Sequence, residues 1–195
     1  MPALTLDVLQ NAMFGENMTN YPVFIETGTL NGETLEALMS SFRELYSVDI
    51  DPNALARAKK RLPRANNIHL ILGDSVEMLP KLLRTKARKM DSYIGDTPTI
   101  YFLDAHYSGN ASPTGKIQVP IYEELRTIMT ICSSSCIVII DYFRLFGKIG
   151  SGGDDWRAIT EKQATNIVSS RLQGVKYLSS PLAEQDRLVF KLGPQ

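Results

Sequence analysis

The sequence predicts an α/β fold: one mostly parallel sheet with helices on both faces and an antiparallel strand near the C-terminus. Apolar runs alternate with helical patterns along most of the chain, which is typical of right-handed βαβ units. The last two strand-like segments are joined by a link too short for a crossover helix. The 195 residues, 44% of them hydrophobic, suffice for one core, and no linker divides them, so we expect a single domain over 1–195.

The strand-like and helical segments alternate in a fixed order. The first five strand-like runs lie at 21–26, 44–51, 67–74, 99–106 and 136–143. The fourth and fifth are continuously apolar, as in strands buried on both faces. The helical patterns between them lie at 32–42, 52–62, 75–83 and 120–131. Each strand is therefore expected to run parallel to the one before it.

The C-terminal part follows a different pattern. A helix is predicted over 155–172, followed by strands at 175–180 and 186–192. The short link between those strands permits a hairpin only, so the final pair should be antiparallel. The glycine-rich segment 148–155 is expected to be a mobile loop at most. With the five preceding strands, the final pair gives seven.

Charge and composition narrow the class of partner. Lys plus Arg and Asp plus Glu both number 21, so no net charge draws the chain toward nucleic acid or an anionic membrane. The N-terminus does not resemble a signal peptide, and no apolar run has the length of a membrane span. We expect a cytoplasmic protein with a small-molecule partner, with reduced thiols at Cys132 and Cys136. A homodimer remains open.

A carboxylate and two glycines mark the first turn from strand to helix. Glu26 ends the first strand, and Gly28 permits a backbone conformation and a close approach that other residues do not allow. Gly32 opens the next helix, whose free N–H groups attract anionic groups. Because Glu26 repels phosphate, a ligand with a cationic group is favoured.

Two further acidic residues end the next two strands. Asp49 ends the second strand, where a carboxylate can accept both hydroxyls of a ribose. Asp51, before Pro52, is expected to cap the following helix. Asp74, beside Ser75, ends the third strand and is a candidate acceptor for an adenine amino group. Three acidic strand ends and a cationic centre favour S-adenosylmethionine over a dinucleotide.

These segments resemble the class I, Rossmann-like, S-adenosylmethionine-dependent methyltransferases. "ETGTLNGET" resembles the glycine motif of that family, "VDID" the ribose motif and "GDS" the adenine motif, and the resemblance runs from Tyr21 to Leu192. It implies a three-layer, seven-stranded sheet and S-adenosyl-L-methionine as cofactor. It also adds Thr29, Ile50 and Asp104 to the cofactor-binding residues.

A finer resemblance concerns the fourth and fifth strands. "FLDAHYSG", "PIYEEL" and "IIDYFRLF" resemble a little-characterised bacterial and viral branch, and more distantly the metal-dependent O-methyltransferases. In those relatives acidic residues follow both strands. Asp104 and Asp141 match the first two metal positions, whereas Tyr142 stands at the third. The resemblance thus implies Mg²⁺ at Asp104 and Asp141, with one ligand missing.

His106 offers a route that needs no metal, because an imidazole can take the proton of an attacking hydroxyl. With Asp104 it forms the predicted catalytic pair, and residues 106–118 are expected to close over the substrate. The predicted reaction is O-methylation of a small molecule or sugar. Two alternatives remain: an NAD(P)-dependent oxidoreductase, although "GTLNG" lacks the G-x-G-x-x-G spacing, and a non-catalytic nucleotide-binding module.

Overall fold

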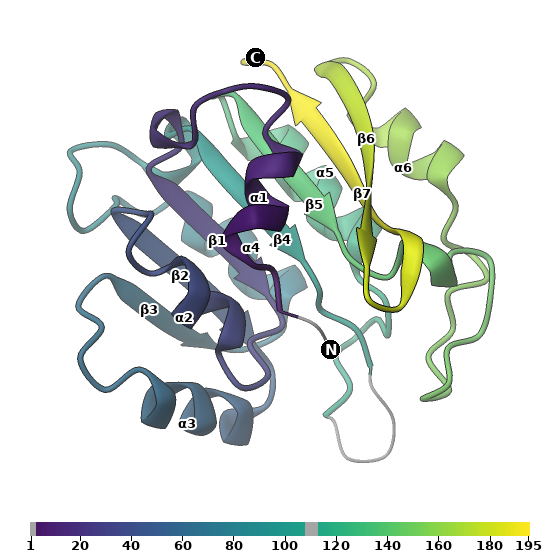
Figure 1. The fold of residues 1–195 in the computed structure, drawn as a ribbon, viewed down its shortest axis with the longest axis horizontal. Helices are drawn as coiled ribbons and strands as arrows, with labels where there is room; N and C mark the ends of the chain where they lie inside the picture. The colour runs from purple at the N-terminus through teal and green to yellow at the C-terminus, as the bar shows by residue number, and fades with distance from the viewer. Residues whose placement is uncertain (1–2, 108–112) are drawn as a thin grey trace.

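A seven-stranded sheet forms the centre of the protein in the computed structural model, which describes residues 3–107 and 113–195 (Figure 1). Its strand order is β3-β2-β1-β4-β5-β7-β6, and β7 runs antiparallel to both of its neighbours. The strands are β1 Val23–Thr27, β2 Glu44–Asp49, β3 Ile68–Leu72, β4 Thr99–Leu103, β5 Cys136–Ile140, β6 Leu172–Ser180 and β7 Ala183–Leu192. The predicted parallel sheet with an antiparallel C-terminal strand is confirmed.

Helices cover both faces of the sheet. They are α1 Leu6–Ala12, α2 Glu33–Leu38, α3 Pro52–Arg61, α4 Ser75–Leu83, α5 Ile121–Ile131 and α6 Glu161–Val168, with short 3₁₀ turns at Met18–Asn20, Ile94–Asp96 and Phe143–Leu145. Helices α1 and α2 pack in one hydrophobic cluster, and α4, α5 and α6 pack in the other, on the opposite face. None of the helices in the described ranges has the length and apolar character needed to cross a bilayer.

Burial explains why the central strands are continuously apolar. Every residue of β1, β4 and β5 is buried, since helices cover both of their faces. β6, at the edge of the sheet, instead alternates between half-buried and exposed residues. Cys132 and Cys136 are buried free thiols, as predicted.

The helix starts follow the expected capping chemistry. Asp51 caps α3 by accepting the Asn53 amide at 2.9 Å, and Pro52 occupies the first turn. Gly32 caps α2 with a φ of 73°, in the left-handed region. A Cβ on Gly32 would also lie 2.9 Å from the Cβ of Ala58, so glycine lets α2 and α3 pack closely.

The C-terminal helix is shorter than the sequence predicts. A helix was expected over 155–172, but α6 spans only Glu161–Val168 and β6 already begins at Leu172. Thr160 caps α6 by accepting the Gln163 amide at 3.2 Å. Upstream, the Trp156 amide donates to the Lys148 carbonyl at 3.0 Å, which commits that stretch to a turn against the glycine-rich segment. The N-terminal helix α1 was not predicted.

Gly28 sits where the chain after β1 meets the chain after β4. Its φ is 89°, and an added Cβ would lie 2.8 Å from the Asp104 carbonyl oxygen. Gly153 has a similar φ of 87°, but a Cβ there would meet nothing within 4 Å. Alanine at position 153 would therefore introduce backbone strain alone, whereas alanine at position 28 would add steric overlap to the same strain.

We expect Gly28→Ala to lower the free energy of unfolding more than Gly153→Ala. The control substitution should cost about 1–2 kcal/mol, the cost of a left-handed conformation for a residue with a Cβ. Gly28→Ala adds the overlap with the Asp104 backbone. Urea unfolding of both variants measures the difference, and equal losses would show that the close approach imposes no constraint.

Candidate active site

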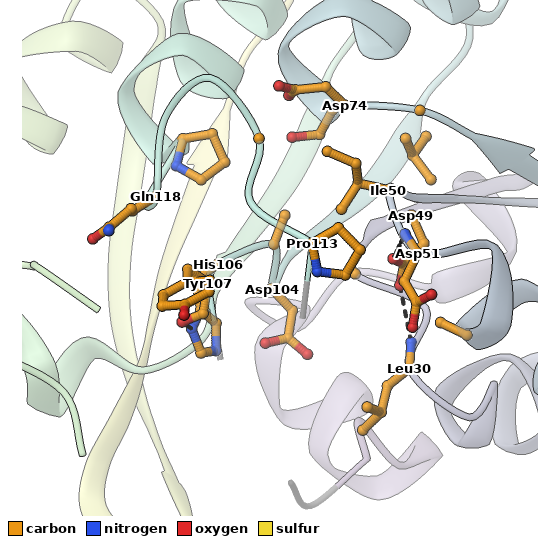
Figure 2. Close-up of a pocket in the computed structure, with 18 of the residues that line it drawn as sticks. Leu30, Asp49, Ile50, Asp51, Asp74, Asp104, His106, Tyr107, Pro113 and Gln118 are labelled. Atoms are coloured by element: carbon orange, nitrogen blue, oxygen red, sulfur yellow. Dashed lines mark hydrogen bonds between the residues drawn. The ribbon is translucent and has the colours of Figure 1, made fainter. Parts of the chain in front are cut away.

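A cavity of about 310 Å³ lies beyond the carboxyl ends of β1, β2, β3 and β4. Strand order reverses between β1 and β4, and ligands of open parallel sheets bind at such a point. Figure 2 shows the acidic residues of the strand ends around this space, with His106 and Tyr107 at its other side. Of the predicted cofactor residues, the lining includes Gly28, Asp49, Ile50, Asp74, Ser75 and Asp104.

Hydrogen bonds to Asp49 connect the glycine turn after β1 to the end of β2. The Oδ2 of Asp49 accepts the Thr29 amide at 2.7 Å. Its Oδ2 also accepts the Leu30 amide at 3.2 Å, and its Oδ1 accepts the Asp51 amide at 2.8 Å (Figure 2). The same carboxylate lines the cavity. Thr29 itself lines a small adjoining hollow together with Gly28.

Asp74 joins two loops at the cavity's edge. Its Oδ1 caps α4 by accepting the Val76 amide at 3.0 Å, and its Oδ2 accepts the Lys116 amide at 2.9 Å. Gly115 lies so close that a Cβ would be 2.7 Å from Oδ2. The loop after β4 therefore folds back over the start of α4. The loop predicted to close over substrate, 106–118, includes residues 108–112, which lie outside the described residues.

Glu26 lies inside the sheet rather than on the cavity wall. The residue is 1% exposed, and its Oε1 accepts the Ser47 hydroxyl at 2.7 Å. Burial raises the pKa of Glu26 to about 8, with a smaller contribution from the charge of Asp49. Direct contact of Glu26 with a cationic ligand thus stays a prediction.

Asp104 is a buried acidic residue of the cavity lining. Its Oδ1 is shut off from solvent and has no hydrogen-bond partner among the described residues. Burial, then the charges of Asp141 and Glu26, raise the pKa of Asp104 well above its ordinary value, and Arg187 opposes this. A carboxylate in this environment is best stabilised by a cationic group in the cavity.

The predicted magnesium site does not fit the donor set. The charge of Asp141 contributes to raising the pKa of Asp104, so the two carboxylates interact. However, Asp141 forms a buried ion pair with Arg187, whose Nε lies 3.1 Å from its Oδ1. Within the described ranges no group of three or more His, Cys, Asp or Glu side chains could hold a metal ion. The Arg187 guanidinium is thus already paired with Asp141, the second of the two proposed metal ligands.

His106 lines the cavity, and its ring packs against aromatic side chains. Its ring centroid lies 4.5 Å from that of Tyr142 and 5.4 Å from that of Trp156. Its Nδ1 lies 3.0 Å from the Tyr107 carbonyl oxygen and 3.3 Å from Asp154 Oδ2. Burial lowers the pKa of His106, although Tyr107 and Asp154 oppose the shift, so the imidazole is neutral near pH 7.

The sequence contains one recognisable domain signature in the half of the fold that carries the glycine turn. Residues 25–86, from β1 into the loop after α4, match a family model described as a methyltransferase domain. The match contains the whole turn and both acidic strand ends that follow it, in the order and sheet topology described above. Residues 25–86 are therefore similar to a methyltransferase domain, and the sheet has the predicted Rossmann-like methyltransferase topology.

Solved structures agree with this methyltransferase fold at low sequence identity. A putative O-methyltransferase from Klebsiella pneumoniae is 15% identical, with a TM-score of 0.68 over 99% of this chain and 84% of that one. The O-methyltransferase from Bacillus cereus in complex with SAH is 12% identical, with a TM-score of 0.64 over 90% and 76%. An rRNA methylase from Streptococcus thermophilus is 14% identical, with a TM-score of 0.56 over 100% and 98%. No curated protein matches the sequence.

Three residues around His106 are not among the predicted residues of this candidate site. Asp154 comes from the glycine-rich segment 148–155, which the sequence predicts to be a loop, and Trp156 lies at the start of the stretch that the sequence predicts to be helical. Tyr142, expected to replace a metal ligand, instead packs on the imidazole. Nothing local in the sequence connects these residues to His106, because their contacts form only when the loop after β5 folds back.

Substitution of Asp49 should weaken cofactor binding. Asp49→Ala removes the acceptor of the Thr29 and Leu30 amides as well as the predicted acceptor of the ribose hydroxyls. The expected loss is about 1–3 kcal/mol of binding free energy for S-adenosylhomocysteine, measured by calorimetry. Asp51→Ala is the matched control, since it removes a helix cap beside the same cavity. Equal affinity of the Asp49→Ala and wild-type proteins would remove Asp49 from the site.

Glu26 should make the protein less stable as pH rises. The folded protein keeps the Glu26 proton up to about pH 8, whereas the unfolded chain loses it near 4.5, so stability falls as pH rises through this window. Glu26→Gln has no such proton to lose. The melting temperature of the variant relative to wild type should therefore increase from pH 4.5 to about 8. Parallel melting curves across this window would contradict the buried, protonated state.

Proposed function

We propose that the methyltransferase transfers a methyl group from S-adenosylmethionine to a hydroxyl oxygen of a small molecule or sugar. One observation carries the proposal: a neutral imidazole lines the same cavity as a carboxylate whose buried oxygen has no hydrogen-bond partner in residues 3–107 and 113–195. The carboxylate, Asp104, suits the cationic donor. The imidazole, His106, suits removal of the acceptor's proton.

The strand ends provide the contacts that the cofactor requires. Asp49 is the proposed ribose acceptor, since each carboxylate oxygen has two lone pairs and can accept a hydroxyl in addition to an amide. Asp74 and Ser75 are assigned to the adenine, beside the apolar side chain of Ile50. Gly28 lets the backbone approach the ligand. When bound, S-adenosylmethionine supplies a methyl group already activated by its positively charged sulfur.

The protein's own task is then to align the acceptor and to handle its proton. His106 is neutral near pH 7 and lines the cavity on the side of Tyr107 and Gln118 (Figure 2). A neutral imidazole can accept the hydroxyl proton as the oxygen attacks. The proposed reaction uses no metal, because Asp141, one of the two proposed metal ligands, is already paired with the Arg187 guanidinium.

A nucleic-acid acceptor is the competing substrate class. Two of the similar structures are named an rRNA methylase and a putative rRNA methylase, and another is an N-methyltransferase. The balance of 21 basic and 21 acidic residues favours a small, uncharged acceptor over a polyanion. Ribosomal RNA and amines therefore belong in any substrate panel.

Turnover with radiolabelled S-adenosylmethionine tests the proposal. The panel contains phenols, sugars, amines and ribosomal RNA, and methylation of a hydroxyl compound is expected. His106→Gln should lower kcat by about 10²- to 10⁴-fold, the usual contribution of a general base, while S-adenosylhomocysteine affinity stays near wild type. Added chelator should have no effect. Transfer only to RNA or amines, or loss of activity with chelator, would contradict the proposed reaction.

A further inference from the structure

We propose that Asp154 is a positioning residue that holds His106 with its hydrogen on Nδ1, so that Nε2 accepts the proton of a hydroxyl substrate. The inference rests on the proposed function for the identity of the reaction. It adds a residue from the loop after β5 and it specifies the class of acceptor.

The contacts of Nδ1 fix the tautomer. Nδ1 lies 3.0 Å from the Tyr107 carbonyl oxygen and 3.3 Å from Asp154 Oδ2, and both of these atoms are acceptors. A neutral imidazole with acceptors on one nitrogen carries its hydrogen there. The basic lone pair is then on Nε2, which is buried, so the substrate hydroxyl has to reach this atom from the cavity that His106 lines. The Tyr142 and Trp156 rings hold the plane of the imidazole.

Several contacts hold the Asp154 side chain in place. The residue is 2% exposed, and its Oδ2 also accepts the Trp156 indole N–H. The Gly150 amide donates to the Asp154 backbone carbonyl at 2.8 Å, and a Cβ on Gly150 would overlap the Asp154 carboxylate. Glycine at position 150 therefore makes room for this carboxylate. Burial of a carboxylate is costly unless charged or polar partners compensate, and the indole and imidazole N–H groups do so.

The charge balance of the reaction explains why a carboxylate belongs there. The acceptor oxygen forms a bond to the methyl carbon, the carbon–sulfur bond breaks, and its electron pair goes to sulfur. The hydroxyl proton passes to His106 Nε2. The positive charge of the site thus moves from sulfur to the imidazole, where Asp154 stabilises it. The proton later leaves to solvent, which restores the neutral ring.

This arrangement favours one class of acceptor. A hydroxyl that keeps its proton at neutral pH needs a base, whereas a neutral amine or an ionised phenolate attacks without one. Loss of Asp154 should therefore damage turnover most for acceptors that enter with their proton. A purely structural role for Asp154 would lower turnover by the same factor for every acceptor.

Nitrogen NMR of histidine decides the tautomer without any substrate. The chain has two histidines, so ¹⁵N-labelled protein in a His69→Gln background reports His106 alone. We expect a single Nδ1–H tautomer in this background and a substantial Nε2–H population when Asp154→Asn or Gly150→Ala is added. Ser151→Ala, at an exposed neighbouring position, is the control and should leave the spectrum unchanged. An Nε2–H tautomer in the starting protein, or an unchanged spectrum in Asp154→Asn, would overturn the proposal.

Kinetics with two acceptors tests the consequence. Asp154→Asn should lower kcat for phenol much more than for 4-nitrophenol, which is largely ionised in mildly alkaline buffer, with the KM for S-adenosylmethionine unchanged. An equal loss for both acceptors would reduce Asp154 to a structural role. If the wild-type protein methylates neither compound nor any other hydroxyl, the proposed function fails, while the NMR result still decides whether Asp154 sets the tautomer of His106.

Discussion

The close approach of the chain after β1 to the chain after β4 is the constraint on which the site depends. Gly28 faces the Asp104 backbone so closely that a Cβ would lie 2.8 Å from its carbonyl oxygen. The Asp104 amide donates to the Thr27 carbonyl and the Gly28 amide to the Val48 carbonyl, so the parallel ladder continues to the edge of the cavity. Strand ends with different side chains thereby meet in one place.

The electrostatics of that edge follow from the same crowding. Glu26, Asp104 and Asp141 are carboxylates with raised pKa values because burial disfavours their charged forms, and Arg187 is the cation that pairs with Asp141. An excess of buried acid is costly for folding. It also creates a site that favours a cationic ligand, which is the property that a sulfonium cofactor requires.

Much of the fold followed from hydrophobic periodicity. Runs such as the one at 136–143 predicted buried parallel strands, and the short link between the last two strands predicted the antiparallel pair. The exceptions have tertiary causes. Packing on the sheet stabilises the N-terminal α1, whose Leu9 is fully buried, more than its own sequence pattern does. The stretch before α6 forms a turn because Trp156 packs against His106 and Phe146.

The site was predictable to the extent that it consists of strand ends. Asp49, Asp74 and Asp104 line the cavity because each follows a parallel strand, and a strand's end can be located from sequence. By contrast, the pairing of Asp141 with Arg187 joins the residue after β5 to the antiparallel strand β7, and the contact between Asp154 and His106 joins two loops. Neither pair has a local sequence signal. The metal assignment lacks support for this reason, because Arg187, the partner of Asp141, is distant in sequence.

Binding calorimetry with S-adenosylmethionine and NADH tests the central claim most directly, namely that the cavity at the carboxyl edge is built for a nucleoside with a cationic tail. The account predicts that S-adenosylmethionine binds to the wild-type protein, that Asp104→Asn weakens this binding, and that NADH does not bind, because its pyrophosphate would face the acidic strand ends. Binding of NADH with equal or higher affinity, or the same S-adenosylmethionine affinity in Asp104→Asn, would contradict it.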